Sequence, residues 1–316
     1  MMICFITAQA QTVGVAVLTH GDAKTMFYGN TALHQAVEAA TEGDVISLSP
    51  GTFNGLNNFS KSGLTIIGSG MDEGPSQTIL TEFRMQANDN EEKFVKLTLK
   101  NVFINNQFQA DNGNYELSLH KCKVLSSFQC SIAPDESSVI EFVNCVSGRD
   151  NMDGFKNTVL NAYNSVLSIA DLGGEDTRSR ILSNCILLGT PKGTGSLYDC
   201  IIYESYQYAT LASSVRATNC IALINAWNDY LGSQKLANRI YNLDFDAFVE
   251  GSFYELKPEL ASEWVDENGE QIGIYGGPEP FSAIPNAPRI TKFNVPTKTD
   301  ADGKLPVEIE IAMPAK

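Results

Sequence analysis

The apolar positions of this chain recur as two short runs of alternating residues separated by one polar residue. Residues 180–188 show the unit, with Leu182 two positions before Asn184. Cys185 and Leu187 continue the apolar alternation after it. Because a strand places alternate side chains on one face, both runs can share a face only if the backbone bends at the Asn. Asn tolerates the left-handed conformation that such a bend requires, so the unit predicts a strand, a bend and a second strand.

This unit repeats along most of the chain, usually at intervals of 20 to 23 residues. The predicted bends are Gly68, Asn101, Lys121, Asn144, Asn164, Asn184, Asp199, Asn219, Asn242 and Gly276. A period of about twenty residues with strand alternation is typical of a parallel β-solenoid, whose coils bury an apolar face only by stacking. We therefore predict an all-β fold, a single-stranded right-handed parallel β-helix of about ten coils, with the hand following from the crossover rule.

Cysteine is common at the position after the predicted bend. It stands there in five units, at Cys122, Cys145, Cys185, Cys200 and Cys220. With Cys130 they make six, since Cys4 would be removed with a signal peptide, and an even number in an exported chain also suits a disulfide framework. Because these five share one inward position, we predict instead that they stack as free thiols and act as small apolar residues.

Different patterns mark the two ends of the predicted solenoid. Residues 31–42 carry apolar residues at helical spacing and precede Gly43, which predicts a capping helix at the first coil. The C-terminal part, 281–316, contains a Pro-rich linker and two alternating runs around a turn at 300–303, a β-hairpin signal. We predict that the hairpin covers the open edge of the last coil, with a docking strand as the alternative. Residues 11–280 then form the β-helix.

Composition and charge limit the classes of binding partner that this chain can have. Lys and Arg number 22 against 37 Asp and Glu, giving a net charge of −15 and a pI of about 4.6. This charge argues against nucleic acid and anionic membrane surfaces. Residues 1–10 combine an apolar run with Ala8-Gln9-Ala10, which predicts the remnant of a signal peptide and export to the periplasm, cell surface or medium. A buried first strand is the alternative, and no later apolar run is long enough to predict a membrane span.

Three stretches of the sequence resemble segments of a known superfamily. Residues 43–55 (GDVISLSPGTFNG) and 63–70 (GLTIIGSG), with the helix before them, resemble the N-terminal region of the pectin lyase-like right-handed β-helix superfamily. Residues 271–277 (QIGIYGG) are similar to the closing segment of exported bacterial β-helix proteins. The resemblance implies the fold. It implies no single activity, since the superfamily contains lyases, hydrolases, esterases and coils of no known activity.

The catalytic motifs of that superfamily are missing. The polygalacturonase-like motifs Asn-Thr-Asp, Asp-Asp, Gly-His-Gly and Arg-Ile-Lys do not occur. Residues 188–192 approach a methylesterase-like motif but lack its Arg and Trp, and 264–268 lack the His of a pectate lyase-like motif. These gaps favour a binding or structural role over catalysis.

Two charged loops are the candidate catalytic region. Asp150 and Asp171 follow their bends by six and seven residues, so we expect them on adjacent coils about 4.7–4.9 Å apart. Carboxylate oxygens bind Ca²⁺, and a nearby Arg or Lys can act as base or clamp in β-elimination of a uronate. The candidate calcium ligands are Asp150, Asp171, Glu175 and Asp176, and the candidate catalytic residues are Arg178, Arg180 and Lys192. Solvated turn residues are the alternative interpretation.

Aromatic residues on two consecutive coils form the candidate substrate-binding surface. They are Tyr203, Tyr206, Tyr208, Trp227 and Tyr230. Exposed rings in register stack on sugar faces, although rings that pack inward are an equal alternative. The sequence thus predicts an exported or cell-surface protein with a carbohydrate-associated binding or structural role. The alternative is a Ca²⁺-assisted lyase acting on uronate-containing polysaccharides.

Overall fold

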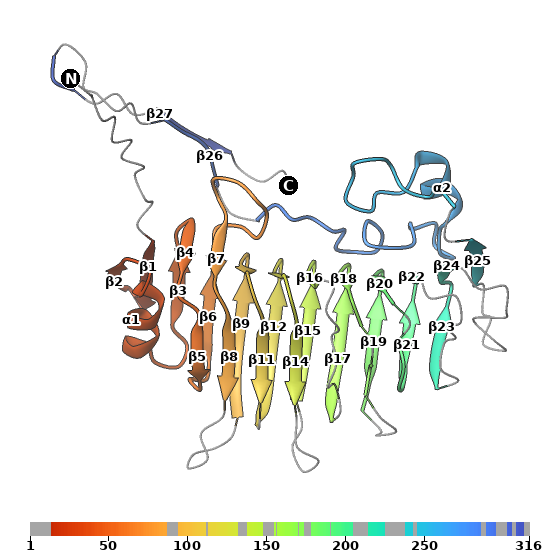
Figure 1. Cartoon of the computed structure of the whole chain (residues 1–316), viewed down its shortest axis with the longest axis horizontal. Coiled ribbons are helices and arrows are strands. Elements are labelled where there is room, and N and C mark those ends of the chain that lie inside the picture. Colours follow the sequence, from red (N-terminus) through yellow and green to blue (C-terminus); the bar gives the residue numbers. More distant parts are fainter. Residues whose placement is uncertain are drawn as a thin grey trace, which may run out of the picture.

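The computed structural model is all-β with long parallel sheets. It describes residues 14–86, 94–111, 113–131, 138–147, 155, 157–169, 171–173, 178–189, 191–204, 214–224, 238–242, 245–285, 289–294, 302–304 and 308–312. Successive repeats of the chain each add one strand to the two longest sheets, so the strands form a solenoid-like stack (Figure 1). We call each such repeat a coil.

Eleven strands form the largest sheet. In spatial order they are β2 (Ala23–Tyr28), β1 (Val15–His20), β3 (Val45–Leu48), β6 (Leu64–Ile67), β9 (Phe94–Lys100), β12 (Asn114–His120), β15 (Ser138–Val143), β17 (Thr158–Tyr163), β19 (Arg180–Ser183), β21 (Gly195–Tyr198) and β23 (Val215–Thr218). β1 pairs antiparallel with both β2 and β3. From β3 onward each strand pairs parallel to the next, as a solenoid requires.

Two further sheets complete the coils. The ten-stranded sheet contains β4 (Gly51–Phe53), β7 (Thr78–Leu80), β10 (Phe103–Ile104), β13 (Lys123–Val124), β16 (Val146–Ser147), β18 (Val166–Leu167), β20 (Ile186–Leu188), β22 (Ile201–Glu204), β24 (Ile221–Ile224) and β25 (Arg239–Asn242). The four-stranded sheet contains β5 (Leu56–Phe59), β8 (Phe83–Gln86), β11 (Phe108–Asp111) and β14 (Phe128–Ser131).

Eight of the ten predicted bends connect the eleven-stranded sheet to the ten-stranded sheet. Seven of them have a left-handed backbone with φ between 47° and 55°, namely Asn101, Lys121, Asn144, Asn164, Asn184, Asp199 and Asn219. Gly68 occupies the equivalent place, since its N–H donates to Lys100 O as the Asn101 N–H donates to His120 O. Its φ is not left-handed, and glycine fits there because a Cβ would clash with the carbonyl oxygen of Asn101.

The last two predicted bends are wrong. Asn242 lies inside β25 and has no left-handed φ, because the final coil reaches the ten-stranded sheet several residues earlier than the repeat suggested. Gly276 lies outside the coils altogether. Both errors come from extending a regular period into a part of the chain where the repeat no longer holds.

Small and aromatic side chains stack in the interior of the coils. The six cysteines at 122, 130, 145, 185, 200 and 220 are buried and free, which confirms the prediction of unpaired thiols. Burial raises the pKa of the Cys130 thiol to about 12. Phe83, Phe108 and Phe128 stack in consecutive coils with ring centroids 5.4 and 4.7 Å apart. Such close-packed ladders supply the apolar burial that holds the coils together.

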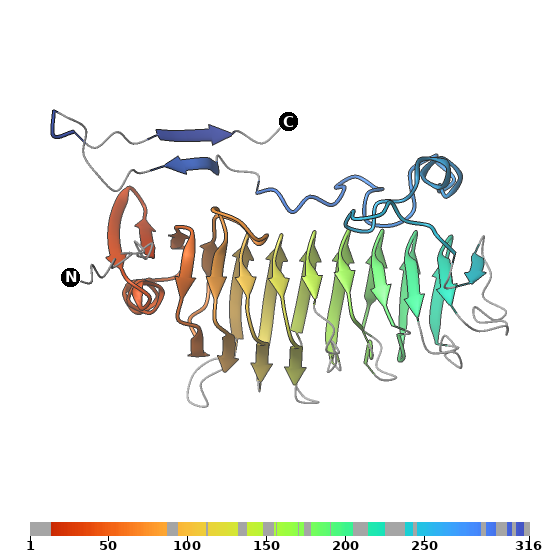
Figure 2. The same cartoon turned by 45° about the horizontal axis from the view of Figure 1, so that its top comes forward.

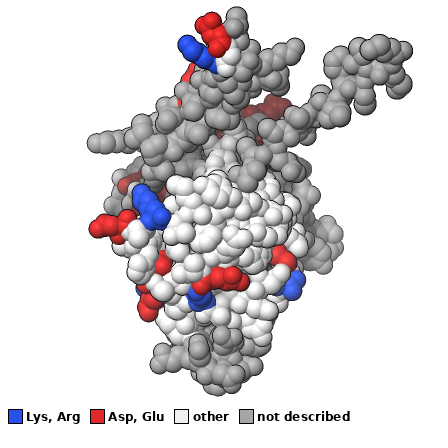
Figure 3. All heavy atoms as spheres, turned by 90° about the vertical axis from the view of Figure 1, so that its left-hand side faces the viewer, with Lys and Arg blue, Asp and Glu red and all other residues white. Residues whose placement is uncertain are grey.

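A short helix packs at the N-terminal end of the stack. α1 (Ala32–Ala39) is shorter than the predicted 31–42, because Ala40 is already extended. Its residues Ala32, Leu33 and Ala36 are fully buried against the first strands. Charged side chains lie mostly around the margin of this end of the molecule (Figure 3).

After β25 the chain leaves the coils and turns back along them. It forms α2 (Pro258–Glu263) and then a segment, residues 271–285, which we call the strap. The strap runs along the bends toward earlier coils (Figures 1 and 2). Its order of contacts shows the direction: Gly273 N–H donates to Asp199 O at 2.8 Å, whereas Lys121 Nζ donates to Ile284 O at 2.7 Å. The stretch predicted to close the last coil therefore lies on the outside of the solenoid.

The strap and α2 bury the outer face of the ten-stranded sheet. Adjacent residues of its strands belong to two different apolar clusters, with Leu187 in the interior and Ile186 outside. The outer cluster contains Val166, Ile186, Ile201, Ile221, Leu260, Trp264, Ile272, Ile274 and Phe281. Strands that are buried on both faces have continuous apolar sequences, and the strands of this sheet have such sequences.

The C-terminal hairpin forms as predicted, but it does not pair with the edge of the last coil. β26 (Arg289–Asn294) and β27 (Glu308–Ala312) pair antiparallel and form a separate two-stranded sheet. The last strands of the long sheets, β23 and β25, do not pair with it. The prediction that the hairpin covers the edge of the last coil is therefore wrong. No helix in the described ranges is long and apolar enough to cross a membrane.

Candidate functional site

The predicted calcium site is represented by one described residue. Asp150, Glu175 and Asp176 lie outside the described residues. Asp171 is exposed and forms a parallel β-bridge with Lys192, so these two residues lie on adjacent coils. The Asp171 Oδ1 accepts the backbone N–H of Gly173 at 2.8 Å. Within the part of the chain that the structure describes, no three metal-binding side chains come together.

The two candidate arginines occupy different environments. Arg180 is 2% exposed, and its Nη2 donates to the carbonyl oxygen of Phe155 at 3.0 Å. Its guanidinium thus ties the start of β19 to the backbone at Phe155 inside the protein, where a polysaccharide cannot reach it. Arg178 is partly exposed and donates from Nη1 to Asn157 Oδ1 at 3.0 Å. Of the candidate catalytic residues, Arg178 and the exposed Lys192 remain accessible.

The predicted aromatic surface is also only partly described. Tyr206, Tyr208, Trp227 and Tyr230 lie outside the described residues. Tyr203 lies on β22 and its ring is 6.4 Å from that of Phe248, edge to face. It therefore packs under the segment that follows β25, as part of the outer apolar cluster.

A groove that the sequence analysis did not anticipate runs beside the strap. Its volume is about 590 Å³. It lies between the outer face of the eleven-stranded sheet and the C-terminal segment, and the described residues of its walls supply carboxylates, amides, an imidazole and a phenol. We call it the strap groove; it is lined by His120, Glu141, Val143, Tyr163, Asn164, Ser183, Asn184, Asp199, Asp266, Glu270, Gly277, Pro278 and Glu279.

Parallel pairing arranges the sheet side of the groove in a regular row. His120, Val143, Tyr163 and Ser183 are direct partners on β12, β15, β17 and β19, and Tyr198 on β21 follows Ser183. Parallel strands lie about 4.8 Å apart, so Tyr163 and Tyr198 stand roughly 9.6 Å apart on one face. Tyr198 is 41% exposed. The row thus presents two phenol rings on rigid strands, with a small serine between them.

The strap side is held by the side chains of the bends. Asn164 is 2% exposed and donates from Nδ2 to the carbonyl oxygens of Ile274 and Gly276 at 2.9 and 2.6 Å. Asn144 accepts the Ser282 N–H at 2.7 Å. These bonds tie carbonyl and N–H groups of the strap to the bends, and Ile274 O accepts a second bond from the Phe281 N–H at 2.7 Å. The left-handed Asn residues therefore both turn the coils and fix one wall of the groove.

The groove is strongly negative. Among the described residues that line it, five carry a carboxylate and none is Lys or Arg: Glu141, Asp199, Asp266, Glu270 and Glu279. Burial raises the pKa of Asp199, and the charges of Asp266, Glu267 and Glu270 raise it further, while the Asn219 amide at 2.6 Å opposes this. The Glu270 backbone N–H lowers the pKa of Asp266. The carboxylates give the groove an excess of negative charge, so it repels anionic ligands.

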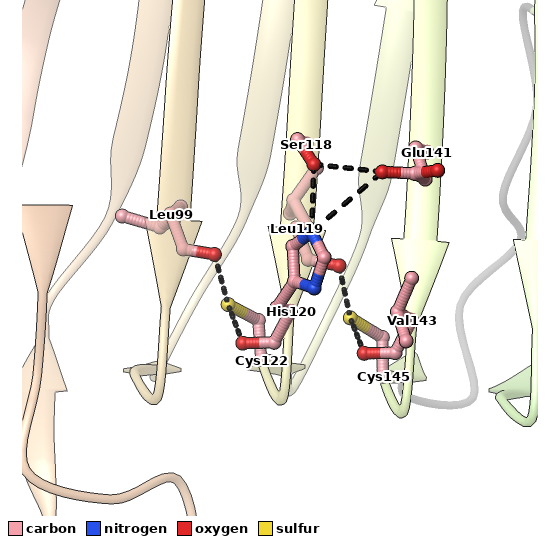
Figure 4. Close-up of polar contacts among 8 residues, drawn as sticks. All are labelled: Leu99, Ser118, Leu119, His120, Cys122, Glu141, Val143 and Cys145. Carbon is pink, nitrogen blue, oxygen red and sulfur yellow. Dashed lines mark hydrogen bonds and ion pairs between the residues drawn. The ribbon is translucent and has the colours of Figure 1, made fainter. Parts of the chain in front are cut away.

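One cluster near the groove contains the residue types of a hydrolytic triad. His120 Nε2 lies 2.8 Å from Ser118 Oγ, which also donates to Glu141 Oε2 at 2.9 Å (Figure 4). In a Ser-His-acid triad the acid binds the ring nitrogen that faces away from the serine. Here Glu141 lies 3.6 Å from the same Nε2 that contacts the serine. The cluster therefore lacks the geometry of nucleophilic catalysis and acts as a polar surface beside the groove.

Sequence reasoning missed the groove because its two walls are far apart in the chain. The outward polar residues of β12 to β19 alternate with the core residues and could have been recognised as one face. The strap wall could not, because the sequence pattern assigned that segment to a coil. Searches of protein-family models, curated proteins and solved structures found no match to this chain.

Proposed function

We propose that this chain is an exported or cell-surface right-handed parallel β-helix protein, similar in fold to the pectin lyase-like superfamily, that binds carbohydrate in the strap groove. The observation that carries the proposal is a row of two tyrosines on one face of the sheet: Tyr163 lines the groove of about 590 Å³, and Tyr198 lies two strands further along the same row. Aromatic rings offer an apolar face to a pyranose and a hydroxyl at their edge. Pockets of this size accommodate small ligands and short oligomers.

The negative charge of the groove limits the class of sugar that it can bind. Carboxylate and amide oxygens of Glu141, Asn184 and Asp266 accept hydrogen bonds from sugar hydroxyls, and an ionised acceptor makes the stronger bonds. A uronate would bring a further negative charge among these carboxylates. The groove therefore favours neutral or amine-bearing sugars over uronates.

An enzyme is the alternative, and one observation keeps it open. Asp171 and Lys192 are both exposed and lie opposite each other on adjacent coils. A carboxylate that binds Ca²⁺ and a nearby amine are the elements that a polysaccharide lyase requires. This site is separate from the strap groove, so the two functions can be tested separately.

Calorimetric titration with neutral, amine-bearing and uronate oligosaccharides tests the proposal. Neutral or amine-bearing oligomers should bind, and Tyr198→Ala should weaken that binding roughly tenfold, which corresponds to about 1.4 kcal/mol. Tyr28→Ala is the matched control, because Tyr28 is 62% exposed at the opposite end of the same sheet. Equal losses in both variants, or binding of uronates alone, would refute the groove. Unsaturated products from uronates in the presence of Ca²⁺, lost in Asp171→Ala, would establish the lyase instead.

A further inference from the structure

A second pocket lies on the other side of the strap. It has a volume of about 370 Å³, and the described residues that line it include three aromatic rings, one acidic and one basic side chain. We call it the aromatic pocket; it is lined by Asp72, Lys123, Val146, Phe253, Tyr275, Phe281, Ser282, Ala283 and Ile284. Lys123 and Val146 come from neighbouring strands of the ten-stranded sheet, whereas the rings come from the C-terminal segment. The strap thus separates this pocket from the strap groove.

The ring of Phe253 forms an exposed but rigid platform. It is 41% exposed, and it stacks on Phe281 with ring centroids 5.1 Å apart and an angle of 27°. Tyr275 meets Phe281 edge to face at 6.1 Å, and its hydroxyl donates to the Phe253 carbonyl oxygen at 2.8 Å. Phe281 therefore supports the Phe253 ring directly, while Tyr275 packs against Phe281 and holds the Phe253 backbone.

The backbone beside this platform is strained. Tyr254 has a φ of 56°, in the left-handed region that a bulky residue rarely adopts. Such a conformation costs roughly 1–3 kcal/mol and persists where the surrounding structure enforces it, often at binding sites. Here the turn packs the partly buried Tyr254 ring against Phe248 at 5.4 Å, and the neighbouring Phe253 is exposed. The strained backbone at Tyr254 therefore accompanies the exposure of the Phe253 ring.

The two charged side chains at the pocket do not pair with each other. In the described part of the chain, Asp72 and Lys123 form no ion pair. Lys123 Nζ lies over the Phe103 ring, 5.5 Å from its centroid. One carboxylate and one ammonium give the wall a balanced charge, which neither attracts nor repels an anion strongly. Together they offer an acceptor and a donor to a neutral, hydroxyl-rich ligand.

We propose that the aromatic pocket binds a single neutral hexopyranose unit of a glycan. The apolar face of the sugar ring stacks on Phe253, Asp72 accepts from its hydroxyls and Lys123 donates to a ring or hydroxyl oxygen. The choice of a sugar as ligand class rests on the proposed carbohydrate-binding function, while the site is distinct from the strap groove. A chain that carries both sites on either side of the strap would contact a glycan at two points.

Saturation-transfer NMR with the methyl glycosides of glucose, galactose and mannose tests this site. At least one of these monosaccharides should bind, with the strongest transfer to the protons of one ring face. Phe253→Ala should raise its dissociation constant at least tenfold, and Phe253→Trp should preserve binding because the platform is kept. Asp72→Asn and Lys123→Met lie outside the strap, so each should weaken binding without moving the melting temperature.

The groove variant separates the two proposals. Tyr198→Ala should leave monosaccharide binding at the aromatic pocket unchanged. If none of the three glycosides binds, or if Phe253→Ala and Lys123→Met bind as the wild type does, the pocket proposal is wrong. Oligosaccharide binding that is lost in Tyr198→Ala would still support the strap groove in that case. Loss of monosaccharide binding in Tyr198→Ala alone would assign it to the groove and overturn the pocket.

Discussion

Replacing Asn164 with Ala tests whether the bend side chains hold the strap on the coils. Asn164 has a φ of 47° and donates from Nδ2 to Ile274 O at 2.9 Å and to Gly276 O at 2.6 Å. Alanine removes both hydrogen bonds and leaves two strap carbonyls with fewer partners. It also places a residue that cannot make local side-chain hydrogen bonds in the left-handed region.

Two terms set the size of the effect. The left-handed conformation costs a residue other than Gly, Asn or Asp roughly 1–2 kcal/mol. Each lost hydrogen bond contributes about 0.5–1.5 kcal/mol, and more where a buried group is left unpaired. The sum predicts that Asn164→Ala lowers the free energy of unfolding by roughly 2–5 kcal/mol.

A matched variant separates the two terms. Asn58 is exposed and has a φ of 62°, but it lies on β5, away from the strap. Asn58→Ala should therefore show only the backbone term, about 1–2 kcal/mol. Asn164→Gly should show the hydrogen-bond loss with little conformational cost, apart from the added entropy of glycine in the unfolded chain.

The assay is urea unfolding of the wild type and the three variants, with limited proteolysis of the native proteins. Asn164→Ala should lower the unfolding midpoint most, and cleavage within residues 271–285 should become faster than in Asn58→Ala. Equal midpoints and equal cleavage rates for the two alanine variants would refute the reasoning. The strap would then be held by its apolar contacts alone.

Two further predictions follow from the titratable groups of the coils. Burial raises the pKa of Asp199, so the ionised carboxylate destabilises the fold above that pKa, and stability recovers as the pH falls through it toward the ordinary value of 3.8. Asp199→Asn should therefore raise the melting temperature at pH 7 and have little effect near pH 3, as measured by thermal scans; a difference that grows at low pH would contradict this. The six described cysteines are buried and free, so a thiol reagent should label them slowly in the native protein, and denatured, unreduced protein should give at least six thiols. Two or fewer thiols on denaturation would contradict the internal ladder.

The repeat could be predicted from the sequence because it depends on short-range structure. Strand alternation, the left-handed tolerance of Asn and the small residue after each bend all act within one coil. The unit at 180–188 folds as predicted, with β19, a bend at Asn184 (φ 51°) and β20. Lys121 adopts the same bend with φ 51°, although lysine, unlike Asn, Asp or Gly, does not favour the left-handed backbone conformation. Stacking between coils imposes that geometry, so the repeat predicted the bend where residue preference alone did not.

The path of the C-terminal segment was decided by tertiary structure. Residues 271–277 look like a coil because strap and coil both alternate apolar residues; in the strap, Ile272 and Ile274 face the outer side of the ten-stranded sheet. The contacts that place them join positions more than one hundred residues apart, such as Asn164 and Ile274. A local pattern states which face of a strand is apolar, but not which distant surface will cover it. The sequence therefore determined the coils and their bends, whereas only the folded chain brought the strap to the bends and created the groove and the pocket on its two sides.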